Sequence, residues 1–174
     1  MTISLYQISA PVVAQMLAGL SGVLEKAAAF AAEKKLDPQA LLTARFAPDM
    51  YDLAKQVRVV CMWATVIAGK LSGSEPPKFA DDEKTFEELR ARVAKAIAFV
   101  NAQDPAAIDA AAGKVIAFPV GPAVRKFKGL DFTVHFALPH FMFHCATCYD
   151  LLRHSGAPLA KRDYMGPVHG MIEG

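Results

Sequence analysis

The sequence predicts a mainly α protein of the four-helix-bundle type, with a long crossover that contains a short β-hairpin before the last helix. Apolar residues recur every three or four positions in four segments of helical length, and clusters rich in Pro, Gly and Ser separate these segments. Hydrophobic residues make up 53% of the 174 residues and charged residues 21%, so the chain can bury one sizeable core. We expect one domain over residues 1–165 and a C-terminal tail over residues 166–174.

The first two long helices are expected from Ser9 to Lys35 and from Asp49 to Leu71. Ser9 followed by Pro11 is typical of a helix start, because Ser caps free N–H groups and Pro is tolerated in the first turn. Pro38 is expected to end the first helix, because proline disfavours a helical conformation at the residue before it.

The third and fourth long helices are expected from about Asp82 to Asn101 and from Asp131, as its cap, to His154. Between them, Lys114–Val120 and Ala123–Phe127 flank a Gly-Pro pair, a pattern typical of two strands joined by a turn. Pro119 has no N–H to donate, so the first strand is expected at a sheet edge.

Charge and apolar patterning exclude several classes of partner. The net charge is +2, too small for a nucleic-acid or membrane-surface binding face. The start of the chain lacks the features of a secretory signal, and the most apolar stretch, Phe132 to Tyr149, carries three His, one Pro and two Thr. We therefore expect a cytoplasmic protein that binds neither nucleic acid nor membrane. The three Cys residues, which cannot all pair within one chain, suit a reducing compartment.

Possible chemistry concentrates in the fourth helix, where His140 and His144 lie four residues apart. That spacing is about 40° of rotation and one turn of rise, so both imidazoles can reach one ion. A third metal ligand must come from another helix, and Asp52 and Gln56 of the second helix are the candidates by residue type. The Glu of the H-E-x-x-H motif is absent, and a metal-free aromatic seam in which each His bonds a neighbour is the other interpretation.

Two further features of the fourth helix have structural and functional interpretations. His135 points elsewhere on a straight helix, but Pro139 is expected to kink the axis and can re-aim it. Cys145-Ala-Thr-Cys148 has redox spacing, yet it lies well inside a helix rather than at its N-terminus after a strand. We interpret these cysteines as structural.

Several segments together resemble a bacterial domain-of-unknown-function family within the DinB/YfiT-like metalloenzyme superfamily. The segments that carry the resemblance are Ala47–Met50 with Gln56, the Pro76-Pro77 turn with Phe79 and Thr85-Phe86, Leu138–His144, Tyr149–Gly156 and Lys161–Tyr164. The resemblance implies a four-helix bundle, frequently dimeric, whose better-known relatives hold a divalent metal on three His and include thiol-dependent transferases and isomerases. His140 and His144 match the metal-binding pair, while Gln56 stands where the His of the second helix is expected.

Three hypotheses follow. In the first, His140 and His144 with Asp52 or Gln56 hold Zn or Ni and activate water or a thiol for transfer to a small molecule. In the second, the pocket holds no metal, and polar side chains that include His144, Gln56, Tyr149 and His135 bind a small organic ligand within a phenylalanine lining. In the third, an exposed apolar helix face makes the protein a structural homodimer. A homodimer is also what the resemblance implies.

Overall fold

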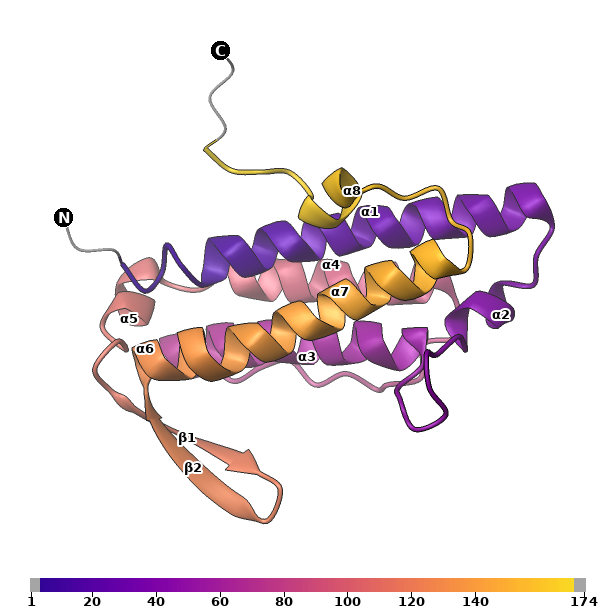
Figure 1. Ribbon diagram of the computed structural model, residues 1–174. Coiled ribbons are helices and arrows are strands. Elements are labelled where there is room, and N and C mark those ends of the chain that lie inside the picture. The colour runs from indigo at the N-terminus through magenta and orange to yellow at the C-terminus, as the bar shows by residue number, and fades with distance from the viewer. Residues whose placement is uncertain (1–3, 171–174) are drawn as a thin grey trace.

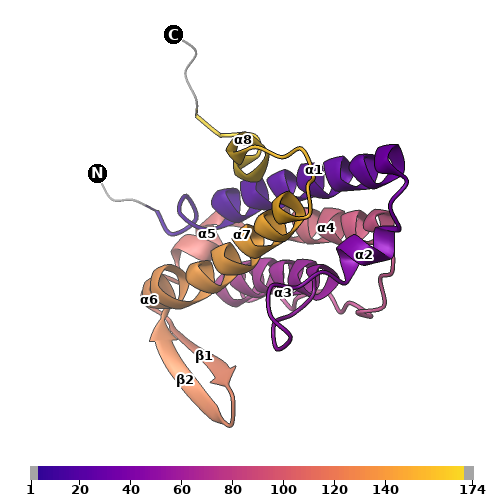
Figure 2. The ribbon, with the colours of Figure 1, turned by 45° about the vertical axis from the view of Figure 1, so that its right-hand side comes forward.

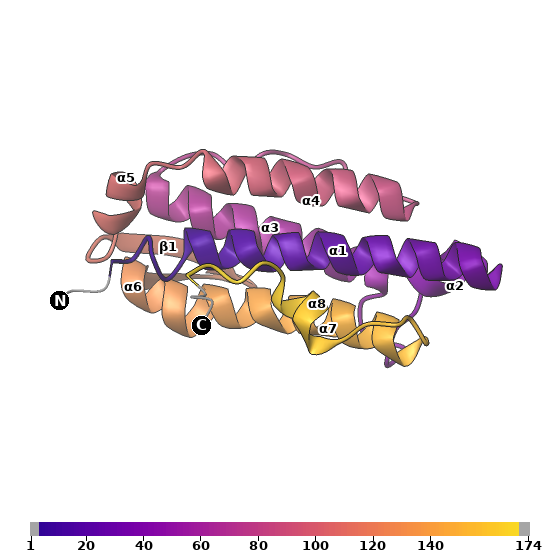
Figure 3. The ribbon, with the colours of Figure 1, turned by 90° about the horizontal axis from the view of Figure 1, so that it is seen from above.

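Four long helices form the body of the protein, as the apolar periodicity predicts. The computed structural model describes residues 4–170. The long helices are α1 (Ala10–Lys34), α3 (Leu53–Ser72), α4 (Phe86–Asn101) and α7 (Leu138–His154) (Figure 1). α3 packs against α4 on one side and α7 on the other, and α1 packs mainly against α4 (Figure 3). The predicted bundle is confirmed.

α1 is more apolar than the sequence patterns predict. Among the described residues it is the one helix long and apolar enough, by composition, to cross a membrane. This differs from the prediction that Phe132–Tyr149 is the most apolar stretch. Within the bundle, the buried side chains of α1 include Val13, Leu17, Leu20 and Leu24, as in a core helix.

Side-chain caps set the starts of α3 and α4. α3 begins at Leu53 because the Asp52 carboxylate accepts a hydrogen bond from the Lys55 N–H. α4 begins at Phe86 because Thr85 and Glu88 form a capping box. Both helices therefore start about four residues later than the predicted Asp49 and Asp82.

The last long helix, α7, continues directly from a π-helical segment. The short helix α6 (Gly129–Asp131) leads into a π-helical segment, η1 (Phe132–Ala137), and then into α7. The predicted capping role of Asp131 is wrong, because its backbone is already helical and its side chain makes no cap hydrogen bond. Leu138 alone separates the π-helical segment from Pro139, the residue expected to kink the helix.

The predicted β-hairpin is confirmed and projects from one end of the bundle. β1 (Val115–Val120) pairs antiparallel with β2 (Ala123–Lys128), and Gly121 in the turn has a φ of 58° (Figure 2). Phe118 from β1 and Phe127 from β2 pack their rings against Phe132 of η1. These aromatic contacts attach a two-stranded sheet that is otherwise marginal in water.

Short helices complete the chain. α2 (Pro38–Leu42) and α5 (Pro105–Asp109) begin with Asp caps, and α8 (Lys161–Met165) folds back onto α1. Lys26 of α1 pairs with Asp163 at 2.7 Å. Gly19 lies so close to α8 that an added Cβ would meet the Tyr164 carbonyl oxygen at 2.6 Å. The segment Lys161–Tyr164 therefore packs on α1.

Candidate functional site

His144 and Gln56 meet between α7 and α3. The Nδ1 atom of His144 lies 2.6 Å from the Oε1 atom of Gln56, and the Gln56 amide nitrogen donates to the Tyr51 carbonyl at 3.2 Å. Gln56 is only 1% exposed. Because the Tyr51 carbonyl can only accept, the amide group of Gln56 must face it and Oε1 must face His144. Nδ1 of His144 is therefore the proton donor.

His144 is held in its neutral form. Burial, together with a smaller contribution from the nearby charge of His140, lowers the pKa of its imidazole from 6.5 to about 4. With the proton fixed on Nδ1, the Nε2 atom carries a lone pair, and within residues 4–170 no side chain or backbone group donates to it. The site thus presents one oriented hydrogen-bond acceptor.

His140 lies one turn before His144 but packs in a different environment. Its ring stacks on Trp63 of α3 with centroids 4.7 Å apart, and it meets the edge of Phe136 at 4.8 Å. His140 is exposed, whereas Trp63 is buried. The imidazole face therefore packs on the indole.

Asp52 is occupied by structural contacts. One carboxylate oxygen caps α3 through the Lys55 N–H at 2.9 Å, and the other lies 3.4 Å from the guanidinium of Arg45. The assignment of Asp52 as a metal ligand stays a prediction, in which Oδ2 would exchange its contact with Arg45 for the ion.

Tyr149 and His135 lie away from the contact between His144 and Gln56. Tyr149 packs against Tyr164 with ring centroids 5.9 Å apart, and with Met16 and Leu20 it lines a small cavity against α1. Five residues along a helix rotate a side chain by about 140°, which places Tyr149 on the other side of α7. His135 is exposed beside His140 in an open hollow at the start of α7.

The donor set does not fit a resident divalent metal held by three protein ligands. The described residues contain no group of three or more His, Cys, Asp or Glu side chains that could hold an ion. Gln56 uses its oxygen on His144 and its nitrogen on Tyr51. Two imidazoles remain, fewer than the three protein ligands of catalytic zinc sites.

The three cysteines lie in buried surroundings that suit a structural role. Cys61, Cys145 and Cys148 are free and buried. Burial raises the pKa of the Cys61 thiol to about 12 and holds the pKa values of Cys145 and Cys148 far above the usual range. A thiolate, the reactive form, is therefore strongly disfavoured at all three positions.

Tyr51 is a residue of the site that the sequence pattern does not predict. Its ring stacks near His144 at a centroid separation of 6.5 Å, and its carbonyl orients Gln56. It precedes α3 in an irregular segment, so no helical spacing could place it. The one available signal was its position next to the Asp52 cap.

The low pKa of His144 predicts a dependence of stability on pH. Between pH 6.5 and about pH 4 the unfolded imidazole takes up a proton and the folded one does not, so stability falls as the pH drops through this window. Because the ring is partly exposed, we expect a loss of about 1–2 kcal/mol. Urea unfolding at pH 7 and pH 4 measures it, and His144→Phe should lose less than the wild type. Equal losses in the two proteins would contradict the prediction.

Gln56→Leu is expected to lower the free energy of unfolding by about 1–2 kcal/mol, because it leaves His144 Nδ1 and the Tyr51 carbonyl without their partner. Gln39→Leu is the control, since Gln39 is exposed and its amide bonds only the Lys84 carbonyl; its change should stay within about 0.5 kcal/mol. Denaturant titration compares them. Equal changes would mean that the buried hydrogen bonds of Gln56 do not stabilise the fold.

The comparisons with known proteins cover nearly the whole chain. Residues 5–165 match the family described as a domain of unknown function, DUF1993. A crystal structure described as a DinB family member protein from Shewanella denitrificans superposes with a TM-score of 0.89 at 33% sequence identity, covering 97% of this chain and 96% of that one. No curated protein matches the chain. The resemblance inferred from the sequence is confirmed.

Proposed function

Because the chain belongs to the DUF1993 family of DinB-like helical proteins, we propose that the seam between α3 and α7 binds a small organic molecule that donates a hydrogen bond to Nε2 of His144. The observation that carries this proposal is the 2.6 Å contact between His144 Nδ1 and Gln56 Oε1. It fixes the tautomer, and a fixed acceptor in a partly buried position rejects molecules that lack a donor.

Aromatic side chains around His144 suggest the shape of the ligand. The ring of Tyr51 lies nearly parallel to the imidazole, and the ring of Phe143 meets its edge at 5.1 Å. Both aromatic residues are more than half exposed, which is unusual for large apolar rings beside a polar acceptor. A planar ligand with an O–H or N–H donor satisfies both features.

The pKa of His144 favours binding over general-base catalysis. An efficient general base has a pKa near the operating pH. The pKa of His144 is lowered to about 4, far below neutral pH. The ring therefore accepts a hydrogen bond well and removes a proton poorly. This supports the small-molecule binding module over the thiol-dependent transferase or isomerase.

Matched probes test the proposal. Phenol has the donor and anisole lacks it, so phenol should bind about five- to tenfold more tightly, the effect of one hydrogen bond of about 1 kcal/mol. Binding is followed by the shifts of the imidazole resonances. His144→Phe, which keeps an aromatic ring, should remove the difference, and His154→Phe on the same helix should keep it.

Three outcomes would overturn the proposal. Phenol and anisole could bind equally, phenol could bind His144→Phe as it binds the wild type, or neither probe could bind. Zn²⁺ and Ni²⁺ are titrated in parallel on untagged protein. Micromolar binding that needs both His140 and His144 would instead favour the metal-dependent alternative.

A further inference from the structure

The segment of residues 73–85, which we call the strap, crosses the groove between α3 and α4. Its Glu83 carboxylate contacts Arg58 of α3 at 2.8 Å and Arg92 of α4 at 2.8 Å. Glu83 is 12% exposed in its side chain and Arg92 is 3% exposed. The strap is therefore anchored to both helices by a largely buried carboxylate.

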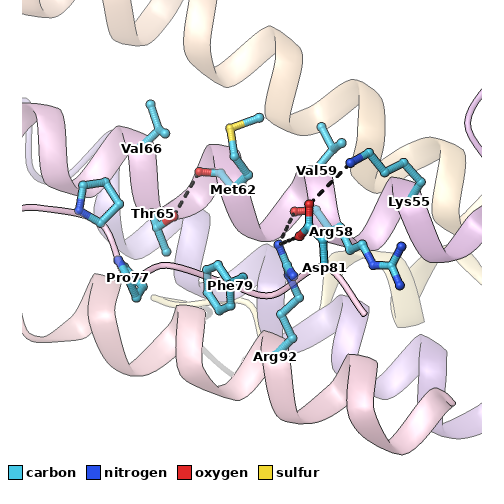
Figure 4. Close-up of a pocket in the computed structure, with 11 residues that line it drawn as sticks. Lys55, Arg58, Val59, Met62, Thr65, Val66, Pro77, Phe79, Asp81 and Arg92 are labelled. Atoms are coloured by element: carbon cyan, nitrogen blue, oxygen red, sulfur yellow. Dashed lines mark hydrogen bonds and ion pairs between the residues drawn. The ribbon is translucent and has the colours of Figure 1, made fainter. Parts of the chain in front are cut away.

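A cavity of about 250 Å³ lies beside the strap and α3 (Figure 4). One part of its wall is apolar and includes Val59, Met62, Pro77 and Phe79. The cationic groups of Lys55, Arg58 and Arg92 line the rest. The volume lies below the range of about 300–1,000 Å³ typical of drug-sized ligands, so it suits a molecule of a few carbon atoms.

Asp81 occupies the cationic part of this cavity. Its carboxylate lies 2.7 Å from Arg92 and 3.5 Å from Lys55, and Figure 4 shows it between these two side chains. Unlike Glu83, it is 46% exposed in its side chain. Its φ of 59° lies in the left-handed region that non-glycine residues seldom adopt. Asp81 thus contacts two cations from a strained and solvent-accessible position.

Arg92 retains unused hydrogen-bonding capacity. Its guanidinium lies over the ring of Phe79 at 4.1 Å, and its buried Nε atom has no partner among the described residues. A buried donor without a partner is uncommon in folded proteins. Lys55, Arg58 and Arg92 together carry one positive charge more than Asp81 and Glu83.

We propose that this cavity binds a small aliphatic monocarboxylate and that Asp81 is a tethered carboxylate that competes with it. The carboxylate of the ligand replaces that of Asp81 on Arg92 and Lys55, and its alkyl chain lies against the apolar wall. Guanidinium and carboxylate form paired hydrogen bonds in one plane, which favours a carboxylate at this position. This site is separate from the seam around His144.

Hexanoate is the probe, with hexan-1-ol and inorganic phosphate as arms that test the carboxylate and the alkyl chain. Asp81→Asn removes the competing charge, so hexanoate should bind about tenfold more tightly than to the wild type in an NMR titration, because a tethered group competes at an effective concentration set by its linker. Asp82→Asn is the matched control, because Asp82 is exposed and forms no ion pair among the described residues. It should bind hexanoate as the wild type does.

Two further variants keep the test decisive. Asp81→Gly should give the same gain, since glycine adopts a positive φ without strain. Adding Lys55→Gln to Asp81→Asn should remove most of the gain, and His144→Phe should leave hexanoate binding unchanged. The proposal is overturned if both Asp81 variants bind hexanoate as the wild type does, if hexan-1-ol binds as tightly, or if phosphate binds in preference.

Discussion

Phe132→Ala is expected to lower the free energy of unfolding by about 4 kcal/mol, within the range for truncating a buried phenylalanine. Phe132 is fully buried in η1 and contacts Phe118 and Phe127 of the hairpin as well as Phe136. Its loss leaves a cavity and removes one of the two rings, with Phe136, that contact both strands. Denaturant titration measures the change.

Phe143→Ala is the control for this prediction, since Phe143 lies on α7 with more than half of its surface exposed. It should change the free energy of unfolding by about 0.5 kcal/mol or less. A loss below 1 kcal/mol for Phe132→Ala, or equal losses for the two variants, would show that the aromatic cluster does not attach the hairpin to the bundle.

Arg92→Leu is expected to lower the free energy of unfolding by about 3 kcal/mol, because removing one partner of a buried ion pair leaves the other uncompensated. Asp81 can return to water, but Glu83 stays anchored by Arg58 alone. Burial alone would raise the pKa of Glu83, yet hydrogen bonds from Arg92 and Arg58 hold it below its usual value. The variant should therefore also raise the pKa of Glu83.

Arg90→Leu is the matched control on α4. Arg90 pairs with Glu25 at 3.1 Å, and the two side chains are 39% and 63% exposed, so the change should lie within about 0.5 kcal/mol. Chemical denaturation compares the two variants. An Arg92→Leu protein as stable as the wild type would mean that the apolar replacement compensates for the whole ion cluster.

The long helices and the hairpin could be predicted because local patterns specify them. Stripes such as Val13, Leu17, Leu20 and Leu24 keep the helical period, and the turn at Gly121 joins two β-prone runs. Helix starts were less accurate, since the Thr85 capping box fixes the start of α4 at Phe86 and not at the predicted Asp82. That motif was present in the sequence and would have given the boundary.

The candidate site could be predicted in part. Helical spacing correctly placed His144 opposite Gln56, because both face the same interhelical seam. Spacing could not show that His140 stacks on Trp63, or that Asp52 is occupied as a cap. Tyr149 was expected at the site, but five residues of helix place it on the side facing α1.

The strap and its cavity could not be predicted. Asp81 and Glu83 lie in an irregular segment, and their partners are 34 residues of sequence apart on two helices, at Arg58 and Arg92. Neither the hydrophobic period nor a known motif relates these positions. Such contacts depend on the packing of α3 against α4, which only the folded chain defines.

The protonation state of His144 decides whether its Nε2 atom can accept a hydrogen bond from a ligand. A pH titration of the wild type by NMR, with the nitrogen resonances of the five histidines resolved, reports both the pKa and the tautomer. We expect His144 to titrate near pH 4 with its proton on Nδ1. A pKa near 6.5, or a proton on Nε2, would contradict the proposed acceptor.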